Sequence, residues 1–359
     1  MKLLNGRTTL SIFFMSAVYA ASPTMASPAG NVYIPLGGDN SIAIVDAATN
    51  SVLGKITGIP NVHGLAGTPD GLYLIAGRND ERPVGAPAPT KPAAVSADEH
   101  TAHHAKTSNK SASKSMVTSS LSVIRLKDRA LIQRIDVPGA VHHVAVGPQG
   151  RYAIVTHPTQ DAVSLVDLMT YDVTATIPTG PLPNYAVFSP DGKNVYVSNA
   201  GNNTVSDVDV AKTIVLRNVL VGGSPEHLVL SRDGKRLFVN NIDDGTVSAV
   251  DIKLGKVSST FSVGSTLHGI DLSDDEKTLF VASLGDDKIA SIDLESGKMR
   301  TVKLGPTPYH LANIRGTGKI YISSADKPMA WVLDQASLKV VGEIAIGGKG
   351  HQMVHVIGN

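Results

Sequence analysis

Apolar and polar residues alternate along most of the chain, in short runs separated by turn residues. The run from Pro183 reads PNYAVFSPDGKNVYVSNAGNNTVSDVD, and the run from Pro225 reads PEHLVLSRDGKRLFVNNIDDGTVSAVD. Each run contains an apolar stretch, an Asp-Gly turn, an alternating stretch, a polar loop and a second alternating stretch. Alternation with a period of two between turn residues is typical of half-buried β-strands in hairpins. The pattern therefore predicts an all-β protein.

The same unit recurs about every 42 residues, and each copy predicts four strands. The first strands of the copies are predicted to begin near Val62, Val141, Pro183, Pro225, Leu267, Tyr309 and Gly350. Repeats of this length with four strands each are typical of β-propeller blades. A solenoid is the alternative that the repeat alone leaves open.

The two ends of the chain are predicted to complete one blade together. The segment GHQMVHVIG at Gly350 has no following strands, whereas NVYIPLGG, SIAIVDA and SVLGKITG between Asn31 and Gly58 have no preceding one. Pairing them leaves no long open strand edge. The expected fold is a seven-bladed β-propeller over 31–359, with one blade closed by the N- and C-terminal strands.

Two of these segments carry a resemblance to a known family. VYVSNAGNNTVSDVD, preceded by SPDGK, and LFVNNIDDGTVSAVD, preceded by SRDGK, resemble the YVTN-repeat seven-bladed propellers, which include periplasmic, YncE-like proteins. The resemblance covers most of 31–359 and implies the fold. It leaves the function open, because propellers host many unrelated activities.

Residues 1–26 are predicted to be a secretory signal peptide. Lys2 and Arg7 precede the apolar stretch TTLSIFFMSAVYAA, and small residues follow, so that cleavage is expected after Ala20 or Ala26. The apolar stretch is shorter than the roughly 20 residues of a spanning helix. An uncleaved membrane anchor is the alternative. We expect an exported, periplasmic monomer without a membrane span after cleavage.

Residues 78–118 interrupt the first complete repeat and are predicted to be a disordered insertion. Pro, Ala, Ser, Thr and Lys dominate this segment, and such a composition does not repay the entropy of ordering. His100, His103 and His104 follow Asp98 and Glu99 within it. The cluster suits weak metal capture, or it is incidental to a tolerated loop.

Composition excludes several classes of function. Lys and Arg number 32 and Asp and Glu 31, which argues against a nucleic-acid partner. The chain has no cysteine, which excludes disulfides, thiolate metal sites and iron–sulfur clusters. Motifs for a nucleophilic serine, a dinucleotide or a P-loop are also missing, and no residue is predicted to be catalytic.

The histidines recur at one position of the repeat. Of twelve histidines, seven lie at or beside the start of a first strand: His63, His142, His143, His227, His268, His310 and His351. First strands are innermost in a propeller, so these side chains are predicted to form a ring at the mouth of the central channel. Imidazoles without thiolates favour Zn²⁺, Cu²⁺ or Ni²⁺, and Glu226 offers a carboxylate. The alternatives are an idle hydrated ring and a small-anion site.

The register of this ring has two solutions in the sequence. Counting back from the turn glycine of each repeat gives one solution, which continues to Gln352 instead of His351: His63, His142, Asn184, Glu226, His268 and His310. Aligning on Pro183, Pro225 and Pro308 instead places His227 with Tyr185 and His310. A one-residue step reverses the direction of a strand side chain. Small bulges at the strand starts would reconcile the two solutions.

Other repeated polar residues are predicted to be structural. His157 is expected to be a solvent-exposed loop histidine, with an outer metal ligand as the alternative, and His355 a packed residue of the closing strand. The aspartates that end the third strands are predicted to cap turns. They are Asp46, Asp167, Asp209, Asp251, Asp293 and Asp334.

Together these features predict an exported metal-binding propeller, with Zn or Cu as the ion. A channel ring beside a histidine-bearing arm resembles the periplasmic zinc-chaperone propellers, which implies a partner such as a metal-transporter binding protein. The alternative is a copper-dependent periplasmic oxidoreductase served by a cytochrome, similar to nitrous oxide reductase and thiocyanate dehydrogenase. A further alternative is a non-catalytic protein-interaction scaffold.

Overall fold

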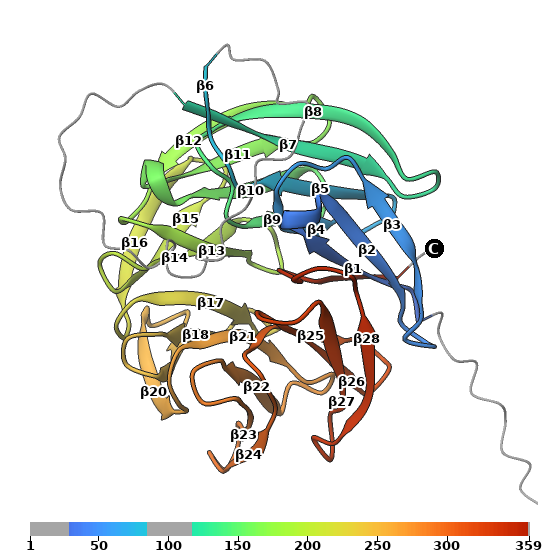
Figure 1. Cartoon of the computed structure of the whole chain (residues 1–359). Coiled ribbons are helices and arrows are strands. Elements are labelled where there is room, and N and C mark those ends of the chain that lie inside the picture. The colour runs from blue at the N-terminus through green and yellow to red at the C-terminus, as the bar shows by residue number, and fades with distance from the viewer. Residues whose placement is uncertain (1–28, 85–116, 358–359) are drawn as a thin grey trace, which may run out of the picture.

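Seven antiparallel sheets stand around one axis in the computed structural model of the chain, which describes residues 29–84 and 117–357 (Figure 1). Each sheet is one blade, and six of them have four strands. Helical structure in the described residues is limited to two short 3₁₀ turns, η1 (Gly37–Asp39) and η2 (Pro158–Gln160). The predicted all-β, seven-bladed propeller is confirmed.

The strands follow one order in every blade, from the axis outward. The innermost strands are β29 (Val354–Val356), β4 (Val62–Gly67), β9 (Val144–Val146), β13 (Pro183–Phe188), β17 (Pro225–Leu230), β21 (Leu267–Leu272) and β25 (Pro308–Ile314). The second strands are β1 (Asn31–Leu36), β5 (Tyr73–Arg78), β10 (Tyr152–His157), β14 (Asn194–Asn199), β18 (Arg236–Asn241), β22 (Thr278–Ser283) and β26 (Lys319–Ser324).

Two further strands complete each blade toward the outside. The third strands are β2 (Ser41–Asp46), β7 (Val117–Arg125), β11 (Ala162–Asp167), β15 (Thr204–Asp209), β19 (Thr246–Asp251), β23 (Lys288–Asp293) and β27 (Met329–Asp334). The outer strands are β3 (Val52–Thr57), β8 (Ala130–Pro138), β12 (Asp172–Pro178), β16 (Ile214–Leu220), β20 (Lys256–Ser262), β24 (Met299–Lys303) and β28 (Val340–Ala345).

The ring closes through the two ends of the chain. Strand β29 pairs antiparallel with β1, with Val356 opposite Asn31 and Val354 opposite Tyr33. Strand β29 also contacts the innermost strands on both sides, β25 and β4. Closure of one blade by the N- and C-terminal strands is therefore confirmed, and the solenoid alternative is excluded.

The core lies between neighbouring blades. Second and third strands are buried along nearly their whole length, as in β14, whereas outer strands such as β16 alternate between exposed and partly buried positions. One interblade cluster combines Tyr33 and Ile44 of the first blade with Leu65 and Leu74 of the next. Both faces of the second and third strands are covered, which explains why the sequences of these strands are nearly continuously apolar.

Turn residues repeat because each blade uses the same side-chain bonds. The Ser189 hydroxyl donates to Asp191 Oδ1 at 2.7 Å, and the Asn194 N–H donates to Ser189 Oγ at 3.0 Å. The following Gly192 has φ +71°, a conformation that favours glycine. At the third strands, Asp46 accepts the N–H of Thr49 at 2.7 Å, and the other five predicted aspartates also accept a backbone N–H, two residues on for Asp167 and three residues on for the rest. Their capping role is confirmed.

The insertion is ordered at its two ends. Strand β6 (Arg82–Pro83) pairs with β7 at Thr118 and Val117, which gives this blade a fifth strand. The rest of the insertion, with His100, His103 and His104, lies outside the described residues, as does the predicted signal peptide at 1–26. Within 29–84 and 117–357, no helix has the length and apolarity needed to cross a membrane.

Candidate metal centre

A β-bulge near the start of the innermost strands positions the histidines. In β17, Pro225 pairs with Asn241 and Leu228 with Val239, so that two residues stand opposite Asn240 alone. Strands β4, β13, β21 and β25 carry the same irregularity. Ahead of β9, the His142 N–H donates to Thr156 O and the Thr156 N–H donates to His143 O. A bulge re-aims side chains that a regular strand would send to opposite faces.

The bulge reconciles the two registers. Its first position holds His63, His142, Asn184, Glu226, His268 and Tyr309. His351 occupies the same position, because its N–H donates to Pro35 O as the His142 N–H donates to Thr156 O. The first of the two solutions, in which His310 aligns with His268, does not hold, because Gly318 lies one residue beyond the equivalent of Gly234. The alignment on proline holds instead, and His310 is equivalent to His227 and Tyr185 at the second position.

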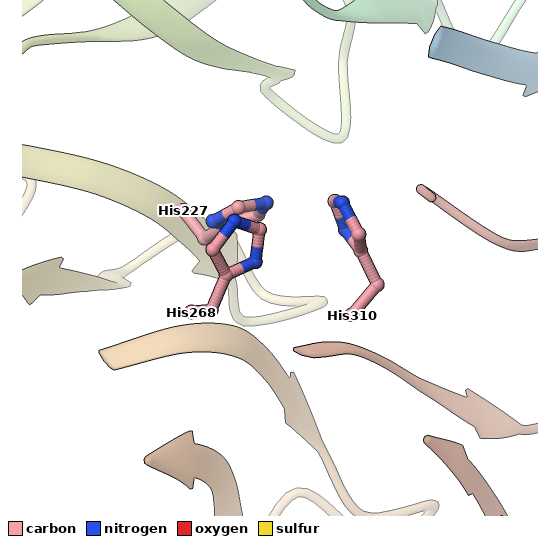
Figure 2. A group of neighbouring side chains, drawn as sticks. All are labelled: His227, His268 and His310. Carbon is pink, nitrogen blue, oxygen red and sulfur yellow. The ribbon is translucent and has the colours of Figure 1, made fainter. Parts of the chain in front are cut away.

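Three of the predicted ring histidines form a compact group. His227, His268 and His310 come from β17, β21 and β25, and one ligand atom of each lies within 4.8 Å of the others. We call these residues the triad. The centroid distances between their rings are 4.1, 4.6 and 5.0 Å. In the view of Figure 2 the rings of His227 and His268 overlap, and the ring of His310 lies opposite them.

The triad is buried, and burial keeps His310 neutral. The three side chains are only 3–4% exposed. Burial is the largest cause that holds the pKa of His310 well below its ordinary value, and neighbouring imidazoles such as His227 add to it. His310 is therefore neutral near pH 7 and keeps a lone pair for a metal. Its Nε2 has no hydrogen-bond partner among the described residues.

Three other ring histidines form a second run on the neighbouring blades. His351, His63 and His142 follow one another, with ring centroids 4.5 and 4.6 Å apart. We call these residues the trio. The His63 Nδ1–H donates to His142 O at 2.8 Å, and the His142 Nδ1–H donates to Asn184 O at 3.0 Å. Burial lowers the pKa of His63 to about 3.

The seventh ring histidine has a different role. His143 Nδ1 accepts the N–H of Ala186 at 3.2 Å, so its neutral ring carries the proton on Nε2. The ring also stacks on Tyr185 with centroids 3.4 Å apart. His143 is therefore the least suited of the seven to be a ligand.

Polar and aromatic neighbours surround the triad. Glu226 Oε2 lies 4.0 Å from His227 Nδ1, and both side chains are buried. The ring of Tyr309 lies 3.9 Å from that of His268. The sequence singled out Glu226 but not Tyr309, although Pro308 marks the strand start from which Tyr309 is the next residue.

Two histidines outside the ring are structural. The expectation that His157 is a solvent-exposed loop residue is wrong: it is the last residue of β10 and fully buried. Its Nδ1 lies 3.0 Å from Ala140 O and its Nε2 2.9 Å from Ser164 Oγ, which also argues against an outer-ligand role. His355 Nε2 contacts Ala29 O at 2.5 Å, as expected for a partnered residue of the closing strand.

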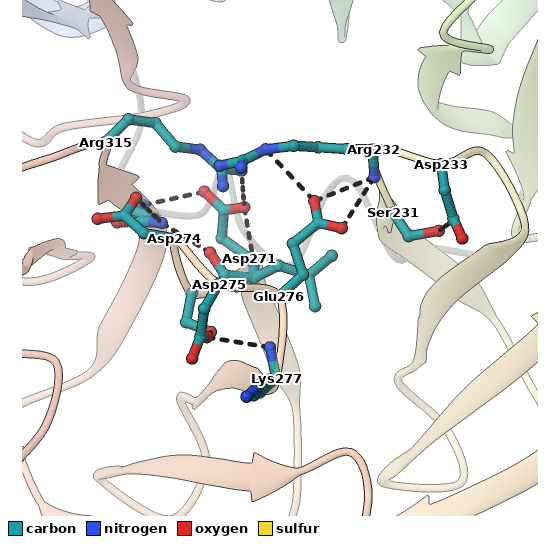
Figure 3. A network of polar contacts seen from close by, with 12 residues as sticks. Ser231, Arg232, Asp233, Asp271, Asp274, Asp275, Glu276, Lys277 and Arg315 are labelled. Atoms are coloured by element: carbon teal, nitrogen blue, oxygen red, sulfur yellow. Dashed lines mark hydrogen bonds and ion pairs between the residues drawn. The ribbon is translucent and has the colours of Figure 1, made fainter.

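A charged network joins the turns at the other end of three innermost strands (Figure 3). The Asp271 carboxylate accepts the N–H of Asn313 at 2.9 Å and lies 3.4 Å from Arg315 Nη2. Glu276 lies 3.5 Å from Arg232 Nε and accepts the Arg232 backbone N–H. Burial raises the pKa of Asp271. Both arginines face carboxylates, so we assign the network to packing between blades.

Comparison with known proteins agrees with this architecture. The family described as lactonase, 7-bladed β-propeller, matches residues 156–342. No curated protein matches the chain.

Solved structures share the fold at low sequence identity. A candidate 6-phosphogluconolactonase from Bacteroides uniformis has a TM-score of 0.68 and 18% identity, over 91% of this chain and 99% of that one. Hydrazine synthase from Kuenenia stuttgartiensis has a TM-score of 0.65 and 16% identity, over 91% and 100%. Dihydro-heme d1 dehydrogenase NirN, in complex with DHE, has 0.62 and 12%, over 91% and 66%. These likenesses concern the fold alone.

Proposed function

The chain belongs to the lactonase family of seven-bladed β-propellers, and within that family we propose that it binds a divalent transition-metal ion through His227, His268 and His310. One observation carries the proposal. Three buried imidazoles from three successive blades bring a ligand atom each within 4.8 Å of the others. The buried Nε2 of His310 has no hydrogen-bond partner among the described residues, and a bound ion would offset the cost of burying it.

The donor set narrows the choice of ion. Three nitrogen ligands without sulfur suit Zn²⁺, Cu²⁺ or Ni²⁺, and zinc sites commonly add one further ligand to three histidines. The buried carboxylate of Glu226 is the nearest described negative group to His227. It would compensate part of the ion's charge in surroundings that solvate charge poorly.

We assign the protein to metal handling and delivery, with the ion as its cargo. The histidines of the predicted insertion, His100, His103 and His104, support this role as a collecting arm close in sequence to the ring residue His63. The predicted signal peptide supports a periplasmic location for the mature protein as part of this proposal. As part of this proposal, it belongs with the YVTN-repeat propellers and passes its ion to a metal-transporter binding protein.

Two enzymatic functions compete with delivery. A copper-dependent oxidoreductase would use the same imidazoles and a cytochrome as its electron partner. Hydrolysis of a lactone is favoured by the name of the family and by the Bacteroides uniformis structure. A metal-bound water is a sufficient nucleophile for that reaction without a serine or cysteine. A protein-interaction scaffold is the non-enzymatic alternative.

Metal content of the full-length protein, purified untagged from the periplasm, tests the proposal. We expect about one tightly held zinc or copper ion per chain that is lost in His268→Ala and in His310→Ala and kept in His355→Gln. Copper with a visible absorption band, or lactone turnover that depends on His268, would instead favour an enzyme. Absence of a metal, with no uptake of added Zn²⁺ or Cu²⁺, would contradict the metal site.

A further inference from the structure

One ring histidine carries a buried donor without an acceptor. His143 is 3% exposed, and its Nδ1 accepts the Ala186 N–H at 3.2 Å. A ring nitrogen that accepts a hydrogen bond carries no proton, so the proton of the neutral ring is on Nε2. This Nε2–H has no hydrogen-bond partner among residues 29–84 and 117–357. Leaving a buried donor unpaired is costly, which points to an acceptor from outside these residues.

His143 lies at the same level of the ring as two members of the triad. His143 and His227 occupy equivalent positions, because each directly precedes the regular pairing of its innermost strand with the second strand. The ring of Tyr185 lies 3.4 Å from that of His143 and 4.7 Å from that of His227. Burial is the largest cause that holds the pKa of His143 well below its ordinary value, and the imidazoles of His227 and His63 add to it. His143 is therefore within electrostatic reach of the triad.

A dication at the triad needs one more ligand and more negative charge than the triad supplies. Zinc bound by three imidazoles takes a water or another oxygen ligand in its fourth position. Neutral imidazoles leave the charge of the ion unchanged, and the buried Glu226 carboxylate, 4.0 Å from His227 Nδ1, offsets one unit of it. Buried charge without compensation is costly. A monoanion with an oxygen ligand atom therefore meets both needs.

We propose that the ring binds a small carboxylate anion, such as acetate or bicarbonate, together with the metal ion, and that His143 Nε2–H donates to it. The inference rests on the proposed function, because the anion takes the open position of the ion at the triad. A carboxylate has two oxygens on one carbon, so one oxygen binds the ion while the other accepts from His143. Burial of His143 and of the triad limits the anion to a few atoms.

A shared anion also couples retention of the ion to its release. When two ligands favour each other's binding, each raises the affinity of the other by the same factor. The ion is therefore held tightly while the anion is bound and loosely once the anion has left. A protein that delivers its ion needs such a change at the moment of transfer.

Cobalt-loaded full-length protein tests the inference, because the visible absorption of Co²⁺ changes when a ligand of the ion changes. The background carries His100→Ser, His103→Ser and His104→Ser, which removes the insertion as another source of ligands. Sodium acetate and, separately, sodium bicarbonate are expected to change the spectrum with saturation, and sodium perchlorate at equal ionic strength to leave it unchanged. Zinc affinity by calorimetry is expected to rise about tenfold in saturating acetate.

Two substitutions of His143 separate its donor from its structural bond. His143→Asn keeps an acceptor near the position of Nδ1 for the Ala186 N–H and removes the Nε2–H, so the affinity for acetate is expected to fall about tenfold or more. His143→Gln keeps an amide N–H near the position of Nε2 and is expected to retain most of that affinity. A purely structural role of His143 predicts the reverse order. His355→Gln is the control outside the ring and is expected to match wild type.

The outcomes separate this inference from the proposed function. Absence of Co²⁺ and Zn²⁺ binding overturns both. Metal binding that responds to neither acetate nor bicarbonate overturns the anion and leaves the metal site intact, with water as the fourth ligand. Wild-type affinity for acetate in His143→Asn overturns the assignment of His143 as the donor. Should a variant lose its circular dichroism spectrum, the response of zinc affinity to acetate in the wild-type sequence decides whether the anion binds with the ion.

Discussion

At the scale of single residues, the same position serves different chemistry in different blades. The last residue of the second strand is Asn199 in β14, where its Nδ2 donates to Ser206 Oγ at 2.9 Å. In β10 the same place holds His157, whose Nε2 meets Ser164 Oγ at the same distance. Burial lowers the pKa of His157 to about 4. The imidazole therefore replaces the amide as a neutral ring, because burial disfavours its charged form.

This difference makes stability depend on pH. The folded state binds the proton of His157 less readily than the unfolded chain, so stability is complete above about pH 6.5 and falls as the pH drops toward 4. The slope for one such group is about 1.4 kcal/mol per pH unit. We expect His157→Asn, which restores the residue of the neighbouring repeats, to reduce that slope by up to this amount.

Urea unfolding of metal-free protein at pH 7, 6 and 5 measures the effect. Wild type and His157→Asn are expected to have similar free energies of unfolding at pH 7 and to diverge at pH 5. If the free energy of unfolding changed equally with pH in the two proteins, the pKa of His157 would not be lowered by folding.

At the scale of strands, the bulge turns a structural repeat into a candidate site. It places histidines of both registers together, since His268 occupies its first position and His227 and His310 its second. In β21 the first position of the bulge is His268 and the second is Gly269. A Cβ there would lie 2.3 Å from the backbone nitrogen of Leu311. The close approach of β21 to β25, and with it the distance from His268 to His310, therefore requires glycine.

We expect Gly269→Ala to push β25 away from β21. Overpacking of this kind costs about 1–3 kcal/mol, and it acts on the backbone that carries His310. Affinity for Zn²⁺ is expected to fall together with the thermal midpoint. Gly38→Ala is the control, because a Cβ at that position meets nothing within 4 Å. An unchanged zinc affinity in Gly269→Ala would show that the triad does not depend on this contact.

The strands were predictable and the bulge was not, for a physical reason. A strand covered on both faces is apolar along its length and a strand covered on one face alternates, so VYVSN and LFVNN indicate strands without knowledge of their partners. A bulge depends on how a strand pairs with its neighbour. The sequence therefore allowed two incompatible alignments of the ring residues. Counting back from Gly318 placed His310 one residue out of register. Burial of His157 was missed for the same reason, because Ser164 comes beside it only when β10 and β11 pair.

At the scale of the whole molecule, stability depends on joining the first blade to the last. The Lys319 ammonium of β26 donates to Ala47 O at 3.0 Å and to Asn50 Oδ1 at 2.9 Å, and the Tyr321 hydroxyl donates to the same oxygen at 2.7 Å. Strand β29 adds its pairing with β1. These contacts join segments more than 250 residues apart in sequence. They order the ring that brings the trio's His351 beside His63.

Closure of the ring can be tested at two adjacent residues of the closing segment. Val356 is 7% exposed and belongs to the cluster between the first two blades, whereas Ile357 is 47% exposed. A carboxylate forced into the first position lacks a partner, so Val356→Asp is expected to cost about 3–5 kcal/mol. Ile357→Asp, with the same change of charge, is expected to remain within about 0.5 kcal/mol of wild type. Urea unfolding at pH 7 measures both values. Equal losses of stability in the two variants would contradict closure by this strand.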